Sequence, residues 1–378
     1  MTVYGGNEKM DKQGKDTIVK YDPRMGPNKT FDGTIRWYSP LEEPFQVAGL
    51  AWFHEEKKYR RLPTVPSKPI SEAVDHMADH TAGGQIRFQC NSSSLSIRVK
   101  LKDKADMVHM PATGQCGVDC YISSMDTFLP LYYVNTTKYD IALSEYECTL
   151  FSNWEPTMRN IVLNLPLYQG VKEIWIGLDE GTEILHPPGY VSNKKIIVYG
   201  TSVTQGGCAC RPGMAYTNIL SRRIPLEFIN LGFSGNGKGE PEVAEIISQI
   251  KDPACLVLDY EGNSGTIEQF RKTLPEFIRI YREVHPTIPI LVVSRFPYSS
   301  EKLFSRTSRL QKERKEFEQS LVNKLREKGD LNIYFFDGSK SLGGEDFYEC
   351  TVDGTHPTDL GFLRIANAFE PVLKTLLL

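Results

Sequence analysis

The second half of the chain alternates short apolar runs with longer amphipathic segments. The apolar runs predict buried strands at residues 195–199, 226–231, 254–260, 288–294 and 331–336. Apolar positions at helical spacing predict helices around residues 213–223, 241–250, 266–284, 304–328 and 358–376. Strands that alternate with helices build βαβ units, whose parallel sheet is covered on both faces. We therefore expect residues 194–378 to form an α/β domain, a three-layer α/β/α flavodoxin-like sandwich with a five-stranded parallel sheet.

The first half of the chain has a two-residue alternation instead. It predicts strands at residues 85–90, 95–101, 117–122, 129–134, 146–151, 159–165 and 172–178. Turn residues such as Asn91-Ser-Ser-Ser94 separate these segments. Short strands with turns between them favour an antiparallel, jelly-roll-like β-sandwich over residues 34–190. Residues 1–33 are polar and lack periodicity, so we expect a loose lead-in segment.

Aromatic residues crowd into the start of the predicted sandwich. Two uses fit them: stacking against a carbohydrate ring, or packing between two sheets, and the second is favoured. The residues concerned are Trp37, Tyr38, Phe45, Trp52, Phe53 and Tyr59.

Composition and hydropathy give no reason to expect a nucleic acid or a membrane as a partner. The 378 residues suit two domains, and the net charge of −3 gives no reason to expect a nucleic acid as partner. No apolar run approaches the ~20 residues that cross a bilayer, so no membrane partner is expected. The N-terminus lacks the apolar core of a signal peptide, which predicts a cytoplasmic protein. A secreted protein whose leader had been removed would share this pattern, and the oligomeric state stays open.

The cysteines and histidines suggest no metal site. The eight cysteines are irregularly spaced without a Cys-x-x-Cys pair, so we expect mostly free, buried thiols. Cys208-Ala-Cys210 is expected at the rim of the site that Ser202 marks, and without histidine partners a metal role there is disfavoured. His76 and His80 have the spacing of a zinc pair, but no glutamate or third ligand accompanies them. A plain helix face is favoured for these two histidines.

Polar residues follow three of the predicted parallel strands. Ser202 comes directly after the first strand, Gly235 lies in a glycine-rich loop after the second, and Asn263 follows the third. The carboxyl ends of parallel strands meet at one edge of the sheet, where ligands bind in open α/β folds. We therefore expect these three residues to lie at a common site.

A second polar block precedes the last predicted helix and reads Asp353-Gly-Thr-His356. Acyl transfer needs a nucleophile, a base, a group that orients the base, and donors for the oxyanion. Ser202 is the predicted nucleophile, His356 its base and Asp353 the orienting carboxylate. The backbone N–H groups of Ser202 and Gly235 and the side-chain amide of Asn263 are the predicted oxyanion hole.

Each of these residues also has a simpler interpretation that involves no catalysis. A serine after a strand is commonly a turn or cap residue, and Asn263 has the right position to cap a helix that starts near Thr266. Gly235 is able to serve only as a turn glycine, and His356 only as a surface residue at a helix start. The joint occurrence of all four blocks favours the hydrolytic interpretation.

Two further residues are candidates for substrate binding. Arg211 lies in the loop after Ser202. It has two equally favoured interpretations: it binds a polar or anionic group of the substrate, or it forms a structural salt bridge. One interpretation of Glu261 is that it orients a group near the oxyanion. The favoured interpretation is a solvated carboxylate at the end of a strand.

The four blocks resemble the SGNH, or GDSL-like, hydrolase family. They read Gly-Thr-Ser202, Gly-Phe-Ser-Gly235, Glu-Gly-Asn263 and Asp353-Gly-Thr-His356, in the family's order. The first block has threonine where Gly-Asp-Ser has a carboxylate, which leaves the nucleophile in place. Gly-x-Ser-x-Thr also lacks the second glycine of the α/β-hydrolase elbow, which argues against that fold.

A further motif resembles the two-domain branch of this family. Gly117-Val-Asp-Cys-Tyr121 is similar to the Gly-x-Asp-Leu-Tyr motif of its N-terminal sandwich, with cysteine in place of leucine. The resemblance implies a serine esterase without cofactor or metal, acting on a small-molecule or oligosaccharide ester such as an acetylated sugar. An acyltransferase using the same acyl-enzyme stays open. So does a non-catalytic carbohydrate-binding protein, although the intact set of site residues argues against it.

Overall fold

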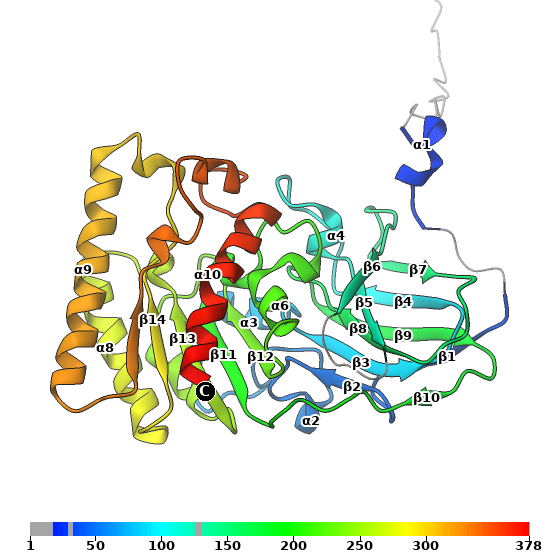
Figure 1. Ribbon diagram of the computed structural model, residues 1–378, viewed down its shortest axis with the longest axis horizontal. Helices are drawn as coiled ribbons and strands as arrows, with labels where there is room; N and C mark the ends of the chain where they lie inside the picture. Colours follow the sequence, from blue (N-terminus) through cyan, green and yellow to red (C-terminus); the bar gives the residue numbers. More distant parts are fainter. Residues whose placement is uncertain (1–17, 29–32, 125–130, 378) are drawn as a thin grey trace, which may run out of the picture.

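A computed structural model describes residues 18–28, 33–124 and 131–377 of the chain. A β-sandwich and a layered α/β unit lie side by side (Figure 1). Of the expected lead-in segment, the described part holds helix α1 (Ile18–Tyr21) and the 3₁₀ turn η1 (Pro23–Met25). No helix among the described residues is long and apolar enough to span a bilayer.

The five predicted strands of the second half form one parallel sheet, as expected. Its strand order is β12-β11-β13-β14-β15, so the first strand lies inside the sheet and the order reverses between β11 and β13. Such a switch point is where ligands bind in open α/β sheets. The strands are β11 (Lys195–Gly200), β12 (Glu227–Gly232), β13 (Pro253–Asp259), β14 (Ile290–Val293) and β15 (Ile333–Phe336).

Helices cover both faces of this sheet, which confirms the three-layer prediction. Along β11, Ile196 and Val198 share one core with helices α6 (Tyr216–Ser221) and α10 (Asp359–Leu377). Ile197 and Tyr199 point to the opposite core. There they meet α7 (Pro241–Ser248), α8 (Ile267–Val284) and α9 (Ser305–Glu327). The helix predicted from residue 213 starts later, because Pro212–Met214 form the 3₁₀ turn η2.

The first half forms two antiparallel sheets packed face to face, again as predicted. All seven predicted strands are present, although β6 begins at Tyr132 and residues 129–130 lie outside the described part of the chain. One sheet holds β1 (Ile35–Tyr38), β9 (Val171–Asp179), β4 (Leu95–Leu101) and β7 (Glu145–Phe151). The other holds β10 (Ile184–Leu185), β3 (Gln85–Cys90), β8 (Arg159–Asn164), β5 (Asp119–Ser124), β6 (Tyr132–Thr136) and β2 (Gln46–Ala48).

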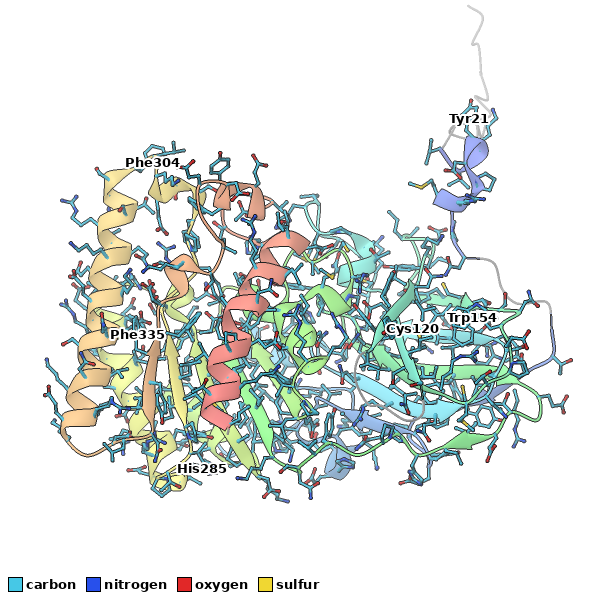
Figure 2. All side chains as sticks on the ribbon, viewed as in Figure 1. Tyr21, Cys120, Trp154, His285, Phe304 and Phe335 are labelled. Atoms are coloured by element: carbon cyan, nitrogen blue, oxygen red, sulfur yellow. The ribbon has the colours of Figure 1, made fainter. Side chains whose placement is uncertain are left out.

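Four of the six aromatic residues pack in the sandwich core, whereas Trp52 packs against the core on the α7–α8 face of the parallel sheet. Phe45, Phe53 and Tyr59 are buried in the sandwich core, and the ring of Phe45 meets Phe88 edge-on at 5.0 Å. Cys120, which stands where the family motif has leucine, is fully buried in the same core (Figure 2). The small, apolar side chain of Cys120 thus occupies a position that faces the sandwich core.

A segment between β2 and β3 packs against the parallel sheet instead. Val74 and Met77 of helix α3 (Glu72–Ala78) belong to the core on the α7–α8 face. Arg61 is fully buried and donates hydrogen bonds to the carbonyl oxygens of Asn230 and Gly232 on β12. Since β12 is an edge strand, these oxygens need donors from outside the sheet, and the buried guanidinium provides them.

Short helices complete the described part of the chain. They are α2 (Phe53–Glu56), α4 (Ala112–Gln115), α5 (Ser202–Gln205) and the 3₁₀ turns η3 (Glu261–Asn263), η4 (Ser299–Glu301), η5 (Gly338–Lys340) and η6 (Phe347–Cys350).

Candidate active site

Ser202 is the first residue of helix α5, directly after β11. Gly200 permits the tight turn, since a Cβ there would lie 1.9 Å from Thr204 Oγ1. Thr201 caps the helix, and its side chain accepts a hydrogen bond from Val203 N at 3.3 Å. The cap role is therefore taken by Thr201, and the Ser202 side chain is left to contact the site.

Asp353, His356 and Ser202 form a continuous chain of contacts. Ser202 Oγ lies 2.9 Å from His356 Nε2, and His356 Nδ1 lies 2.7 Å from Asp353 Oδ2. A carboxylate only accepts hydrogen bonds, so Nδ1 carries the proton in the neutral imidazole. The lone pair on Nε2 then faces the hydroxyl of Ser202. This arrangement is able to take the proton of Ser202 while Asp353 stabilises the charged imidazolium.

The turn that holds Asp353 keeps its side chain ionised. Burial alone would raise the pKa of Asp353, but Oδ1 accepts hydrogen bonds from the backbone N–H groups of Thr355 at 3.0 Å and His356 at 2.8 Å. Together with the bond from His356 Nδ1, these donors outweigh burial and lower the pKa to about 2. Asp353 is therefore charged at neutral pH, as the orienting role requires.

The glycine-rich loop lies against the turn of Ser202. Phe233 N donates to Gly200 O, and Ser234 N donates to Gln205 Oε1, both at 3.0 Å. Gly235 follows with φ of +67°, and a Cβ built on it would meet nothing within 4 Å. Gly235 is thus a turn glycine with an exposed backbone, in a loop whose preceding residues contact the Ser202 turn.

Asn263 ends the 3₁₀ turn η3 after β13. It does not cap α8, because Thr266 does so in a capping box with Gln269. The Oδ1 atom of Asn263 is buried without a hydrogen-bond partner among the described residues. Arg314 on α9 holds the adjoining residues, donating to the side-chain Oγ of Ser264 at 2.6 Å and to the backbone carbonyl oxygen of Gly265. The amide of Asn263 is therefore not used by the local helix.

The favoured expectation for Glu261 is wrong. Its side chain is buried in η3, not solvated. Glu261 Oε2 accepts a hydrogen bond from Arg295 N at 2.7 Å. Burial raises the pKa of Glu261, although the nearby Arg295 guanidinium acts in the opposite direction.

Arg211 forms the structural salt bridge that was one of its two interpretations. Its Nη1 lies 2.8 Å from Asp119 Oδ2, which also accepts from Gly213 N at 2.7 Å. Nη1 contacts the hydroxyl of Tyr121 as well, and the guanidinium lies over the Tyr133 ring. The aspartate and tyrosine of the Gly-x-Asp-x-Tyr motif therefore bind the loop after Ser202 to the sandwich.

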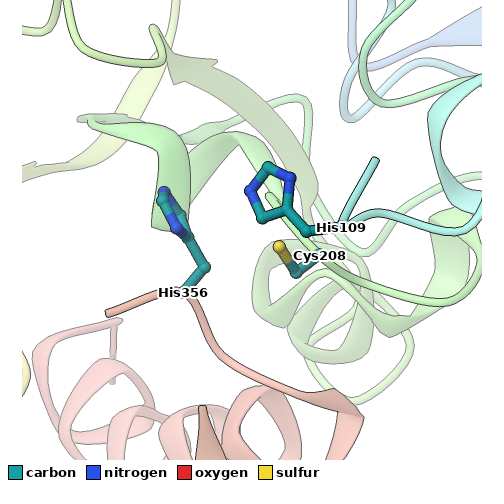
Figure 3. Close-up of side chains that lie close together, drawn as sticks. All are labelled: His109, Cys208 and His356. Carbon is teal, nitrogen blue, oxygen red and sulfur yellow. The ribbon is translucent and has the colours of Figure 1, made fainter. Parts of the chain in front are cut away.

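Two histidines from the first half lie near this region, and only His80 had drawn attention in the sequence. His109 Nε2 lies 3.8 Å from Asp353 Oδ2, and its ring lies 5.8 Å from that of His356 (Figure 3). His80 lies beyond the end of α3, so the expected helix face shared with His76 is wrong. Its Nδ1 instead meets Gln205 Nε2 at 3.0 Å.

Similarity to known proteins shows the family of the chain. A sequence model of the GDSL-like lipase/acylhydrolase family matches residues 193–374, and one of the N-terminus of SGNH-hydrolase-type esterases matches residues 35–184. The solved structure of a Bacteroides ovatus ATCC 8483 protein classed as a GDSL-like lipase is 30% identical, with a TM-score of 0.83. That alignment covers 91% of this chain and 98% of the other. The chain belongs to the GDSL-like lipase/acylhydrolase family. It is thus an ester hydrolase by class.

Two more distant structures share the fold of this GDSL-like hydrolase. A salicylyl-acyltransferase from a tetracycline biosynthetic pathway is 19% identical with a TM-score of 0.72, covering 90% of this chain and 97% of the other. A family two carbohydrate esterase from Cellvibrio japonicus is 14% identical with a TM-score of 0.58, covering 91% and 98%. No curated protein sequence matches the chain.

Proposed function

We propose that this GDSL-like hydrolase cleaves esters of short acyl groups, acetyl in the leading case, through an acyl-enzyme on Ser202. The observation that carries the proposal is the unbroken contact chain from Ser202 Oγ through His356 to Asp353, at 2.9 and 2.7 Å. It supplies the nucleophile, the base and the orienting carboxylate that acyl transfer needs.

In the proposed reaction, Ser202 Oγ attacks the ester carbonyl while His356 Nε2 takes its proton. Negative charge then develops on the carbonyl oxygen, and the N–H groups of Ser202 and Gly235 with the amide of Asn263 bind it. The imidazolium next protonates the leaving alcohol, and the ester C–O bond breaks. Water repeats the sequence and releases the acid, without metal or cofactor. Loss of one oxyanion donor typically costs about 10²–10³ in rate.

Acetylated sugars are the proposed substrate class. The family two carbohydrate esterase from Cellvibrio japonicus supports this choice through its shared fold. A family two carbohydrate esterase from Clostridium thermocellum, solved in complex with cellohexaose, has a TM-score of 0.53 at 16% identity over 78% of this chain. An oligosaccharide ester is therefore the first natural substrate to test.

Substitution of the nucleophile tests the mechanism. We expect Ser202→Ala to lose hydrolysis of p-nitrophenyl acetate by about 10³-fold or more, since no acyl-enzyme forms. A fluorophosphonate probe should label the unaltered protein at Ser202. Ser308→Ala on the exposed face of α9 is the matched control and should keep full activity. Full activity in Ser202→Ala would refute the proposal, and failure to label would favour a carbohydrate-binding protein without catalysis.

Acyl transfer to an alcohol is the second candidate function. The shared fold with a salicylyl-acyltransferase, at a TM-score of 0.72, favours it specifically. Both reactions use the same acyl-enzyme and differ only in whether water or an acceptor hydroxyl attacks it. Product analysis with and without acceptor alcohols separates them, because only a transferase yields a new ester in competition with water.

A further inference from the structure

We propose that His109, Cys208 and His356 form a binding site for Zn²⁺ and that the bound ion switches the esterase off. One ring nitrogen of each histidine and the Sγ atom of Cys208 all lie within 4.8 Å of one another (Figure 3). His109 comes from the sandwich, between β4 and α4, whereas the other two belong to the hydrolase layers. The site therefore exists only when the two halves are packed together.

The ligand set suits zinc among the common divalent ions. Two imidazoles and one thiolate are ligands that Zn²⁺ accepts, with water in the fourth position of a tetrahedron. Zinc bonds of about 2.0–2.1 Å to nitrogen and 2.3 Å to sulfur place ligand atoms roughly 3.3–3.7 Å apart. The 4.8 Å limit is close to this spacing. The side chain of His109 is 38% exposed, so it has room to close the remaining distance.

The other two ligands are held firmly in place. Cys208 is buried and adopts φ of +73°, a left-handed backbone that residues other than glycine seldom adopt. Strained backbone of this kind persists where the surroundings determine it, and it is frequent at functional sites. Asp353 Oδ2 lies 2.7 Å from His356 Nδ1. A carboxylate in contact with an imidazole is the usual companion of a metal-bound histidine, because it orients the ring and raises its basicity.

Inhibition follows from the single lone pair of a neutral imidazole. A zinc ion on Nε2 of His356 occupies the lone pair that would take the proton of Ser202. A zinc ion on Nδ1 displaces Asp353 and leaves the ring proton on Nε2, where it blocks the same step. Whichever nitrogen binds, His356 is lost as a base, so the ion inhibits the proposed reaction and does not assist it.

Cobalt binding tests the site without reference to catalysis. Co²⁺ replaces Zn²⁺ in such sites, and a thiolate ligand gives a sulfur-to-cobalt charge-transfer band. We expect the full chain to bind one Co²⁺ with this band, and Cys208→Ser to lose the band. Cys210→Ser, two residues along, is the matched control and should keep it. An unchanged band in Cys208→Ser would overturn the proposal.

Zinc inhibition tests the switch, which rests on the proposed esterase. Hydrolysis of p-nitrophenyl acetate is followed against free Zn²⁺, with every variant compared to its own zinc-free rate. We expect His109→Ala to need about tenfold or more zinc for half-inhibition, and a chelator to restore the rate. His54→Ala, an exposed histidine elsewhere in the sandwich, should behave like the unaltered protein.

The outcomes of the two experiments distinguish three claims: the zinc site, inhibition by the bound ion, and the proposed esterase function. Equal zinc sensitivity in His109→Ala would overturn the site, and cobalt binding without inhibition would overturn the switch. A chain with no esterase activity that still shows the cobalt band would refute the proposed function alone.

Discussion

Asp353, whose side chain is 36% exposed, is held in its charged form by groups of its own turn. The donors are two backbone N–H groups and the ring of His356, all within three residues. Such short-range hydrogen bonds do not depend on distant packing. These donors outweigh burial, the largest single effect, and lower the pKa of Asp353 to about 2.

We predict that Asp353→Asn lowers kcat by about 10³–10⁴ and changes KM little. The amide does not enforce the proton on Nδ1 and does not stabilise the imidazolium. Steady-state kinetics on p-nitrophenyl acetate measures both constants. Asp346→Asn, which alters an exposed carboxylate paired with Arg364, is the control and should leave kcat unchanged. A kcat within twofold of the unaltered enzyme in Asp353→Asn would contradict the assignment.

Asp259, the last residue of β13, is a buried carboxyl beneath the Ser202 turn. Its Oδ2 accepts hydrogen bonds from Thr204 Oγ1 at 2.8 Å and Tyr216 OH at 2.9 Å. Burial nevertheless dominates and raises the pKa of Asp259 to about 7. The folded state therefore keeps a proton that the unfolded chain releases near pH 4.

This difference makes stability fall as pH rises. Between about pH 4 and 7 the folded state binds more protons than the unfolded state, so the free energy of unfolding decreases with pH. We predict that Asp259→Asn removes this pH dependence. Between pH 4 and 7 the free energy of unfolding of the variant should rise, relative to that of the unaltered protein, by on the order of a few kcal/mol. Denaturant unfolding of both proteins at pH 5 and 7.5 measures it. Parallel pH profiles would show that Asp259 titrates normally.

At the scale of elements, loops and short helices position the proposed oxyanion donors. The glycine loop after β12 is held by Gln205 of α5, and η3 after β13 is held by Arg314 of α9. Strand ends bring these elements to one edge, and side chains from neighbouring helices then set their spacing. Small shifts of such loops affect rate strongly, since a misplacement of about 1 Å is able to cost 10²-fold.

We predict that Gly235→Ala and Gly181→Ala lose similar stability but differ in activity. Both glycines have positive φ, +67° and +82°, and a Cβ on either meets nothing within 4 Å. Each substitution therefore costs about 1 kcal/mol of backbone strain and no clash. Only Gly235→Ala should lower kcat, by about tenfold or more, because its loop carries a proposed oxyanion donor. Thermal unfolding and kinetics of both variants check this, and equal kcat values would exclude the loop from catalysis.

At the scale of the whole molecule, the sandwich and the hydrolase layers are joined by a buried ion pair. Asp119 has no exposed side-chain surface and contacts Arg211, Gly213 and Asn164. The sequence-based boundaries, residues 34–190 and 194–378, assign the two charges to different domains. The loop that follows Ser202 is thereby fixed by the sandwich.

We predict that Asp119→Asn destabilises the protein by about 3–5 kcal/mol, since Arg211 then lacks its counter-charge in a largely buried setting. Denaturant unfolding measures the loss. Glu147→Gln, which breaks the exposed pair with Arg98, is the control and should cost less than about 1 kcal/mol. A similar small effect in Asp119→Asn would mean that the ion pair does not hold the domains together.

The sequence by itself determined the elements and the blocks of the candidate site. Apolar runs marked all five parallel strands, because strands buried on both faces have almost no polar positions. Ser202, Gly235 and Asn263 could be grouped, since parallel strands end at one edge of a sheet. Asp353 and His356 were paired by a spacing of three residues, which a single turn satisfies.

Only the tertiary structure decided which distant side chains meet. Arg211 and Asp119 are 92 residues apart, and their ion pair depends on how the sandwich docks on the sheet. The burial of Glu261 and the approach of His109 to Asp353 depend on the same packing. Residue periodicity reports which side of an element is buried, but it carries no information on what covers that side. The contacts between the domains could therefore not be predicted from the sequence, whereas the strand ends that carry the candidate site could.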